Sequence, residues 1–307
     1  MEKRLTRSEL VFSMGFLFML VVAVATFFYG VKIGAARTEA KYEPMKLLQS
    51  DVAGNAVAYQ QQDLVSFYHT VYLPNREFQL QWFNVMDKLR SGQATDPVSS
   101  FKELAKLAKK QYSAASSSSV PTSSPLLNQS QLNVLKSLKL FEQAASRFAS
   151  TADNKPSKEL VVEIGLEAYY RKAVQHNLLA QQQYYASMLK WGATVEAAIP
   201  SEFNTPASES IKDWNSQPLL VKNKIIADQL VELQQLVNFY PHDLSTRVDE
   251  LIASGEASRL KIKSVPALIE LLLGTKAVRA GDFASGKTML YDQELLPQLP
   301  FFFPENQ

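Results

Sequence analysis

Residues 158–197 read KELVVEIGLEAYYRKAVQHNLLAQQQYYASMLKWGATVEA, and their apolar side chains recur at steps of four and three. The mean step is about 3.7 residues, close to the period of a straight α-helix. The spacing therefore predicts one long helix over this range. Its stripe consists of Val162, Leu166, Tyr169, Ala173, Asn177, Ala180, Tyr184, Met188, Trp191 and Val195.

The remainder of the chain has the same helical character. Pro, Gly, Ser and Asn separate segments of helical spacing, and no run alternates with the period of a β-strand. We therefore predict an all-α protein, with a bundle of about seven to eight helices. Pro74 is expected to start a new helix that Gly92 ends, and Asp96 to cap the next one. A further stripe predicts a helix that carries Val134, Leu138, Phe141, Ala145 and Phe148.

Residues 219–240 carry a strict repeat of four and three. This pattern covers three heptads with one Asn on the seam, as in a coiled coil. The helix could associate with a second copy of the chain or pack inside its own bundle. The flanking positions show no consistent pattern of paired charges, which favours packing inside the bundle. The repeat positions are Leu219, Asn223, Ile226, Leu230, Leu233, Val237 and Tyr240.

Near the N-terminus, residues 10–31 read LVFSMGFLFMLVVAVATFFYGV and contain no charged side chain. As a helix, this run would cross the hydrocarbon core of a bilayer, which is about 30 Å thick. The sequence thus predicts a single transmembrane helix, with the lipid bilayer as its partner. The alternative is a cleaved signal peptide, because residues 23–25 offer a small-residue cleavage site. The apolar run continues through Phe27 and Phe28, which favours an anchor.

Flanking charges do not settle the orientation of this anchor, because three basic residues precede it and three follow it. The chain contains no cysteine, which fits an exported protein that has no disulfides and also excludes a thiol nucleophile. The near-neutral, Ser-rich remainder favours the same topology. We therefore expect a single-pass protein of the cell membrane, with its bulk outside the cytoplasm and a short N-terminal tail of residues 1–9 inside.

Composition suggests how the rest of the chain is divided. A juxtamembrane stalk is expected over residues 32–43, a first helical part over 44–112, and a second over 131–307 that ends in a Pro/Phe-rich tail. Residues 113–130, between the two parts, are rich in Ser and Pro and have too few apolar side chains to offset the entropy of ordering. We predict a flexible linker or long loop there.

The charge balance argues against a nucleic-acid partner. Residues 42–307 carry 26 basic and 27 acidic side chains and are nearly neutral. Affinity for nucleic acid comes mainly from basic side chains, and no run of Lys or Arg is interleaved with aromatic residues. We therefore predict that the protein binds no nucleic acid.

Residues 281–288 read GDFASGKT and match the phosphate-binding loop pattern G-x-x-x-x-G-K-[ST]. Such a loop follows a β-strand, whereas the residues before Gly281 have helical spacing. Only 19 residues follow Thr288, too few for the rest of a nucleotide-binding sheet. We therefore predict no nucleotide site. The stretch is expected to form a helical corner in which Gly281 ends one helix, Asp282 caps the next and Lys287 is a surface charge.

No cluster predicts a catalytic, cofactor or metal site. Glu163 and Glu167 lie one turn apart and could act as acid and base, but Arg171 follows Glu167 at the spacing of an ordinary salt bridge. The chain is therefore predicted not to be an enzyme. The histidines are far apart and lack a second ligand at metal spacing; they are His69, His176 and His242.

Aromatic and amide side chains mark a possible interaction surface, because such groups stack and hydrogen-bond at protein interfaces. Two Tyr pairs flank a Gln run on the long helix, and the C-terminal LPQLPFFFPENQ is too apolar to remain in water. The alternative for each Tyr pair is one core residue and one exposed neighbour. The candidate residues are Tyr169, Tyr170, Gln181, Gln182, Tyr184, Tyr185, Phe301, Phe302 and Phe303.

These observations together predict a membrane-anchored, extracytoplasmic helical interaction or scaffold protein of the cell envelope. It would act on a protein partner without catalysis. Two alternatives remain: a ligand-sensing ectodomain that signals through a partner, and an envelope hydrolase with an unfamiliar site. A tail of about nine residues cannot hold a signalling domain, so the sensor would need a second protein.

Overall fold

The computed structural model describes residues 58–153 and 155–303. All regular elements in these residues are helices, apart from one isolated bridge between Ser210 and Ser264. The predicted all-α class is therefore confirmed for this part of the chain. The predicted number of about seven to eight helices is too low, because breaks such as those at Glu167 and Gln234 divide the chain into more and shorter helices. The helices are α2 (Gln61–Phe67), the π-helix η1 (Tyr68–Tyr72), α3 (Leu73–Arg90), α4 (Pro97–Ser116), α5 (Pro125–Thr151), α6 (Ser157–Leu166), α7 (Ala168–Val195), α8 (Ile211–Asn215), α9 (Leu219–Glu232), α10 (Pro241–Ala253), α11 (Glu256–Arg259), α12 (Val265–Gly274) and α13 (Asp282–Leu290).

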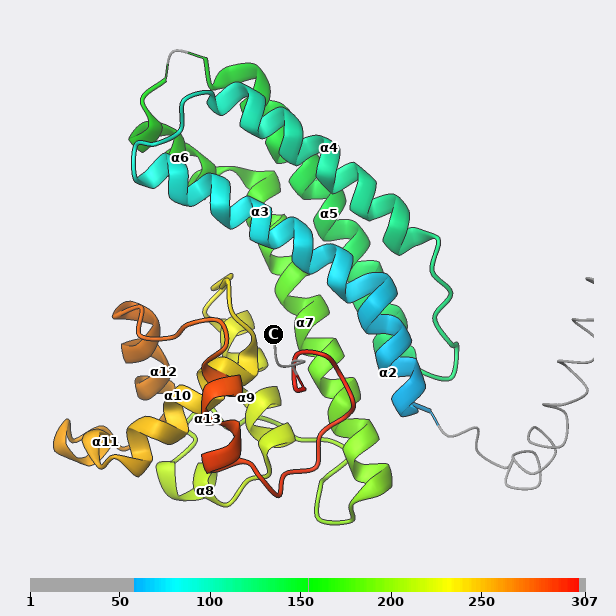
Figure 1. Cartoon of the computed structure of the whole chain (residues 1–307), viewed down its shortest axis with the longest axis vertical. Coiled ribbons are helices and arrows are strands. Elements are labelled where there is room, and N and C mark those ends of the chain that lie inside the picture. Colours follow the sequence, from blue (N-terminus) through cyan, green and yellow to red (C-terminus); the bar gives the residue numbers. More distant parts are fainter. Residues whose placement is uncertain (1–57, 154, 304–307) are drawn as a thin grey trace, which may run out of the picture. The chain divides into compact units, whose positions relative to one another are not determined.

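The helices form two groups that meet along α7. The long-helix group consists of α2, η1 and α3–α7, in which α5 packs between α4 and α7. The short-helix group consists of α8–α13 and gathers beside the C-terminal half of α7, where α9 is its main contact (Figure 1). Both groups contribute to one continuous hydrophobic core, and α7 is the main helix along which they meet.

Several predicted helix signals are confirmed. Gly92 follows α3 in a left-handed conformation, with φ of 71°. The Asp96 carboxylate accepts a hydrogen bond of 2.9 Å from the backbone N–H of Ser99 and so caps α4. The apolar stripe predicted between Val134 and Phe148 is buried along α5.

The predicted single helix over residues 158–197 is wrong at one point, because the chain breaks at Glu167. This residue has an extended backbone, and its carboxylate accepts a 2.7 Å hydrogen bond from Tyr170 N–H, which starts α7 as a new helix. The break changes which face is buried. From Ala173 to Trp191 the predicted stripe lies in the core, whereas Val162 and Leu166 on α6 are exposed.

Pro74 does not start a separate helix. The chain instead runs from α2 into α3 through the π-helix η1, a wider turn than the α-helix. In an α-helix the carbonyl of Thr70 would accept from residue 74, but proline has no N–H. Here that carbonyl accepts a hydrogen bond of 3.2 Å from the hydroxyl of Ser118.

Ser118 belongs to the Ser-rich connection, which is shorter than the predicted segment of residues 113–130. Only residues 117–124 separate α4 from α5. The last turns of α4 and the first turns of α5 are helical although they have few apolar side chains, because the two helices pack against each other. The connection is also tied down. Gln131 Nε2 donates to the carbonyl of Ser118, and the Ser124 hydroxyl accepts from Tyr59 N–H at 3.0 Å.

The predicted helix over residues 219–240 is also wrong, because α9 ends at Glu232. Gln234 then adopts a left-handed conformation with φ of 50°, and α10 begins only at Pro241. The first two heptads form the seam, and its side chains are buried in the protein's own core. The seam Asn223 accepts a hydrogen bond of 2.8 Å from the Ser245 hydroxyl of α10. This contact satisfies the amide oxygen of Asn223 inside the protein's own core.

The corner at GDFASGKT differs in detail from the prediction. The helix α12 ends at Gly274, well before Gly281. Gly281, with φ of 94°, is itself the N-cap of α13, and Asp282 is the first helical residue. The Asp282 carboxylate accepts from Arg279 N–H at 2.8 Å. Lys287 is not a free surface charge, because its ammonium donates a 2.8 Å hydrogen bond to the carbonyl of Phe302.

The predicted transmembrane helix of residues 10–31 lies outside the described residues, as do the tail of residues 1–9 and the stalk of residues 32–43. Within residues 58–153 and 155–303, no helix combines the length and the apolar character that a bilayer crossing requires.

The Lys287 contact gives a first testable prediction. Its ammonium lies 3.5 Å from the centre of the Phe303 ring in addition to bonding Phe302, so it fastens the C-terminal segment to α13. We expect Lys287→Ala to lower the free energy of unfolding by about 1 kcal/mol. Lys136→Ala, at an exposed helical lysine of α5, is the matched control and should have almost no effect. Chemical denaturation measures both, and equal effects would contradict the fastening role.

Candidate functional site

Four of the predicted interaction residues come together in one place. Tyr184 and Tyr185 of α7 meet Phe301 and Phe302 of the C-terminal segment in an aromatic cluster around His242 of α10. The sequence did not indicate that these two segments meet. The cluster consists of Tyr68, Tyr72, Tyr184, Tyr185, Tyr240, His242, Phe283, Phe301 and Phe302.

Phe301 is the residue through which the C-terminal segment joins the cluster. Its ring stacks on His242 at 5.0 Å between centroids and on Tyr240, also at 5.0 Å. Tyr68 of η1 meets the same ring edge to face at 5.3 Å. Such geometries stabilise beyond the area they bury, by about 0.5 to 1.5 kcal/mol for each pair. Phe301 is half-buried, whereas Phe302 beside it is fully buried.

Most of the cluster is core and does not lie on a surface. Tyr184, Tyr185 and Phe302 are buried, which corrects the prediction that these three belong to an exposed interaction surface. The physical reason is that η1 and α10, which are distant from α7 in sequence, pack over Tyr184 and Tyr185 and bury both side chains. The Tyr184 hydroxyl, which would be costly to bury alone, donates a 2.9 Å hydrogen bond to the carbonyl of Leu64.

The other predicted residues lie apart from the cluster. Tyr170 stacks on Trp82 at 5.4 Å, and Tyr169 beside it is exposed. This arrangement matches the alternative of one packed and one exposed tyrosine. Gln181 is buried, and Gln182 donates a 2.9 Å hydrogen bond to the carboxylate of Asp228 on α9. The exposed ring of Phe303 covers Lys287.

Arg76 was not singled out from the sequence, yet it connects the cluster to both helix groups. Its guanidinium lies 4.8 Å from the centre of the Tyr240 ring. One nitrogen donates to the carbonyl of Val237 at 3.2 Å, and the other donates to the carbonyl of Asn238. Arg76 is buried, and these carbonyls together with the ring face replace the water that its charge loses.

From Arg76, a buried polar network continues into the long-helix group. Arg76 donates at 2.9 Å to Gln79, whose amide donates at 2.7 Å to Asn177 on α7. Asn177 in turn donates to Asn75 and, more weakly, to the Ser137 hydroxyl of α5. A satisfied buried network of this kind fixes the register of the helices that it joins.

His242 is enclosed by aromatic rings and hydrogen-bonded to Tyr185. Its Nδ1 lies 3.0 Å from the Tyr185 hydroxyl oxygen. Burial in the apolar surroundings holds the pKa of His242 well below its usual value, and the nearby charge of Arg76 lowers it further. The imidazole is therefore neutral near pH 7 and serves as a flat ring in the cluster.

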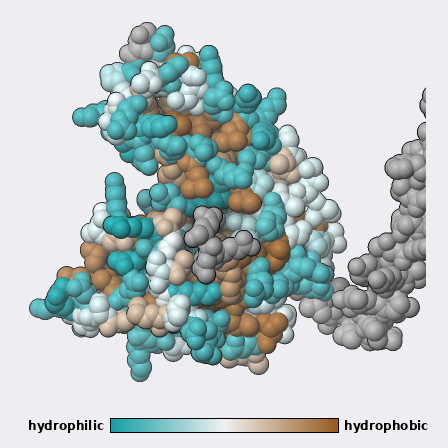
Figure 2. Space-filling model, viewed as in Figure 1, coloured by the Kyte–Doolittle hydropathy of each residue, from teal (hydrophilic) through white to brown (hydrophobic). Residues whose placement is uncertain are grey.

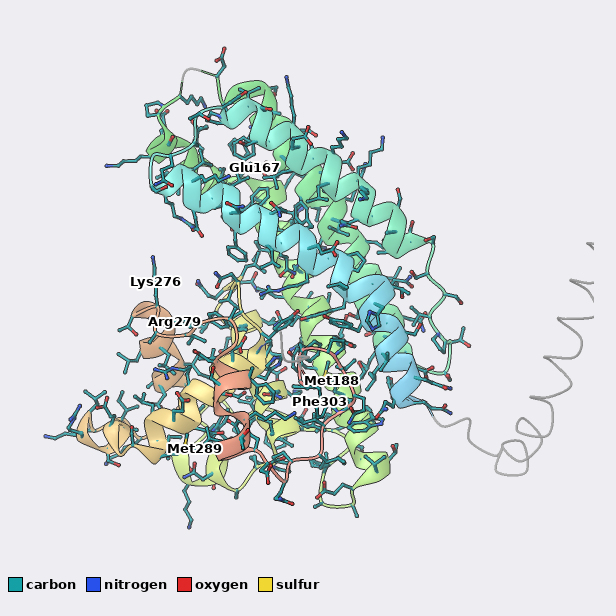
Figure 3. The ribbon with its side chains drawn as sticks, in the orientation of Figure 1. Glu167, Met188, Lys276, Arg279, Met289 and Phe303 are labelled. Carbon is teal, nitrogen blue, oxygen red and sulfur yellow. The ribbon has the colours of Figure 1, made fainter. Side chains whose placement is uncertain are left out.

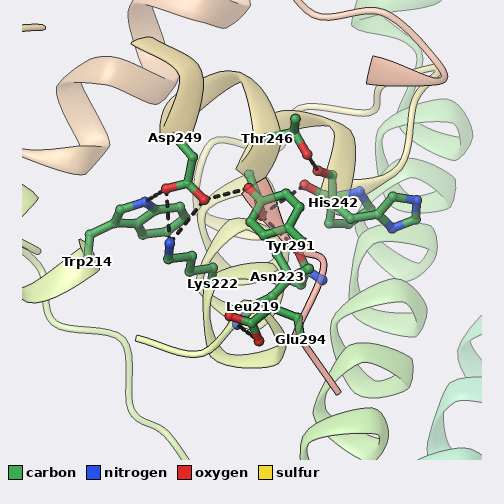
Figure 4. Close-up of polar contacts among 11 residues, drawn as sticks. Trp214, Leu219, Lys222, Asn223, His242, Thr246, Asp249, Tyr291 and Glu294 are labelled. Carbon is green, nitrogen blue, oxygen red and sulfur yellow. Dashed lines mark hydrogen bonds and ion pairs between the residues drawn. The ribbon is translucent and has the colours of Figure 1, made fainter. Parts of the chain in front are cut away.

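A second buried polar site lies beyond His242 in the short-helix group, around Asp249 of α10 (Figure 4). Its carboxylate accepts hydrogen bonds from Trp214 Nε1 at 2.6 Å, from Lys222 Nζ at 3.0 Å and from the Tyr291 hydroxyl. Burial, followed by the charge of Asp249, raises the pKa of Tyr291, so the phenol keeps its proton and donates it. All these groups are occupied with one another, which gives Asp249 a structural role joining α8, α9 and α10.

Asp243 joins α10 to the corner before α13 in a similar way. One carboxylate oxygen accepts from Gly281 N–H at 3.1 Å and from Phe283 N–H at 3.0 Å, and the other accepts from Tyr240 N–H at 2.9 Å. Burial raises the pKa of Asp243, and these backbone donors oppose that rise. The carboxylate thus supplies the cap that the sequence assigned to Asp282.

Of the remaining titratable candidates, His69 is exposed on η1, and the others have local partners. His176 Nδ1 lies 2.8 Å from the amide oxygen of Asn133. Glu163 forms a 2.7 Å salt bridge with Lys155. Glu167, after the helix break, pairs with Arg147 at 3.5 Å and not with Arg171. No group of three metal-ligating side chains occurs in the part of the chain that the structure describes.

His242 leads to a prediction about pH. In the unfolded chain a histidine binds a proton below about pH 6.5, whereas folded His242 resists protonation because its pKa is lowered. The contribution of the neutral ring to the free energy of unfolding is therefore fully present above about pH 6.5. It is lost as the pH falls toward 5, by at most about 1.4 kcal/mol for each pH unit.

The test compares the parent with His242→Asn in denaturant titrations at pH 7, 6 and 5. The variant should be less stable at pH 7, because it loses ring contacts, but its stability should fall less between pH 7 and 5. Some pH dependence should remain, because the pKa of His176 is lowered too. Parallel losses in both proteins would show that His242 does not contribute.

Comparison of the chain with family models, with curated proteins and with solved structures finds no match.

Proposed function

We propose that this chain is a single-pass membrane protein of the cell envelope, with its bulk outside the cytoplasm, which binds a partner protein as a non-catalytic helical scaffold. The uncharged run of residues 10–31 would be the anchor, since its length suits a bilayer. The described helices form a compact unit with its own core, as a scaffold presented at a membrane requires.

The observation that carries the partner-binding role is an exposed apolar strip, which consists of Val162, Leu166 and Tyr169. Their exposed fractions are 62%, 67% and 41%. Val162 and Leu166 lie one turn apart on the same face of α6, and Tyr169 lies in the first turn of α7. Exposed apolar side chains one turn apart on a helix are typical of protein contact surfaces. Tyr169, three residues after Leu166, adds an exposed aromatic side chain of the type that dominates binding contacts.

The core does not need this strip. Leu160 and Ile164 occupy the buried side of α6, so the strip faces the other way. Its position is nevertheless fixed, because Glu167 caps α7 and pairs with Arg147 of α5. Glu167 marks this corner in Figure 3. The face in Figure 2 is largely hydrophilic or neutral, and apolar residues reach the surface in separate areas.

Two substitutions on α6 separate contact with a partner from folding. Ile164→Ser removes a buried apolar side chain, so we expect it to lower the free energy of unfolding by about 2 to 4 kcal/mol. Leu166→Ser, two residues away, changes an exposed side chain and should alter stability by about 0.5 kcal/mol or less. Thermal and chemical denaturation of the full chain measure both.

The same position tests the partner. A photo-crosslinking amino acid at Leu166 should give a discrete adduct with a second protein in intact cells, and Tyr169→Ser should reduce its yield. The crosslinker at Ser119, an exposed residue of the 117–124 connection, is the control and should not give that adduct. An identical adduct from both positions, or none from Leu166, would contradict binding at the strip.

The absence of cysteine permits a clean test of topology, because the parent chain has no thiol background. We expect Ser119→Cys to react with a membrane-impermeant maleimide in intact cells or, where an outer membrane is present, in spheroplasts. Ser8→Cys, in the expected cytoplasmic tail, should react only after lysis. The reverse pattern would invert the topology, and recovery of the protein in the fraction soluble at high pH would refute the anchor.

A further inference from the structure

A surface hollow of 370 Å³ lies where α10, the end of α12 and the start of α13 meet. It is lined by Arg247, Lys276, Ala277, Arg279 and Asp282. Lys276 and Arg279 are close together beyond the C-terminal end of α12 (Figure 3). The hollow is separate from the aromatic cluster and from the apolar strip, and neither of those features accounts for it.

The charges in the hollow are only partly balanced. Arg247 is paired, since it bonds the carboxylate of Glu250 and its Nε lies 3.7 Å from Asp282. Within residues 58–153 and 155–303, Lys276 and Arg279 form no salt bridge, and their side chains make no hydrogen bond. Two cations without partners thus line one concave site, where their fields add.

The backbone fixes where both cations start. Lys276 follows α12 in a left-handed conformation with φ of 54°, the position that glycine usually occupies after a helix. The next residue, Ala277, closes the helix end with a 3.0 Å hydrogen bond from its N–H to the carbonyl of Leu272. The N–H of Arg279 is held at 2.8 Å by the Asp282 carboxylate. A lysine in place of the favoured glycine puts a charge on the rim of the hollow at some cost in strain.

We propose that this hollow binds a phosphate group of a small molecule or lipid. A phosphate monoester carries close to two negative charges near pH 7 and three acceptor oxygens, which matches Lys276 and Arg279. The guanidinium of Arg279 can bind two of those oxygens at once, and the ammonium of Lys276 supplies a compact charge. Asp282 repels an anion and limits the affinity. The proposal is independent of the membrane topology and of the apolar strip.

The test uses the full chain purified in a nonionic detergent, with inorganic phosphate as the probe and sodium chloride at equal ionic strength as the reference. Phosphate should raise the unfolding temperature of the parent more than chloride does. Lys276→Gly should keep or raise the basal unfolding temperature, because glycine accepts the left-handed backbone, yet its phosphate affinity should fall about tenfold, the factor for one charge-assisted contact.

Lys261→Gly is the matched control. Lys261 also follows a helix in a left-handed conformation, with φ of 57°, but it does not line the hollow. This variant should show the same gain in basal stability and the full response to phosphate. Asp282→Asn keeps an acceptor for Arg279 N–H and removes the repelling charge, so it should bind phosphate more tightly than the parent.

A parallel titration with dioctanoyl phosphatidic acid distinguishes the two sources of the group. A response to inorganic phosphate that Lys276→Gly loses supports a free phosphate ester. A response to the lipid alone, again lost in Lys276→Gly, supports a lipid headgroup. The proposal is overturned if neither probe acts beyond chloride, or if Lys276→Gly responds as the parent does.

Discussion

The buried guanidinium of Arg76 is the contact on which the arrangement of the two helix groups depends. It starts on α3, in the long-helix group, and donates to the carbonyls of Val237 and Asn238, which precede α10 in the short-helix group. An unsolvated charge is costly, and loss of any partner would leave part of that cost uncompensated. The two helix groups can therefore pack together only in a position where both carbonyls and the Tyr240 ring contact the Arg76 guanidinium.

The π-helix before α3 makes this placement possible. Pro74 cannot complete the backbone ladder, and the wider turn η1 lets the helix continue through it, while Ser118 satisfies the carbonyl of Thr70. As a result Tyr68 and Tyr72 lie on the same continuous helix as Arg76. Tyr72 and Arg76 contact Tyr240, and Tyr68 contacts Phe301, which stacks on Tyr240. The serine-rich connection, which composition alone marks as flexible, thus supports the element that carries the central charge.

The success and failure of the sequence-based predictions have a common physical cause. Periodicity located the buried faces of α5 and of α7 beyond Ala173, because burial acts on every turn of a helix. Helix ends were found where Gly or Asp provides them, as at Gly92 and Asp96. They were missed where a long side chain adopts the left-handed conformation, as Gln234 and Lys276 do. Neither Gln nor Lys is a typical signal for the end of a helix. The helix of the heptad repeat was therefore predicted to continue to Tyr240, and the helix before Gly281 to continue past Gly274.

Local sequence patterns likewise predicted some features of the candidate sites and not others. The aromatic residues themselves were visible in the sequence, but the meeting of Phe301 with His242 joins segments about 60 residues apart, and no local pattern encodes such a contact. The predicted core stripe included Val162 and Leu166. The helix break at Glu167 leaves these two side chains exposed, and they form part of the apolar strip. The basic hollow depends on the missed end of α12. Two of the deviations from the sequence rules, at Glu167 and at the end of α12, therefore lie at the surfaces for which a partner and a ligand are proposed.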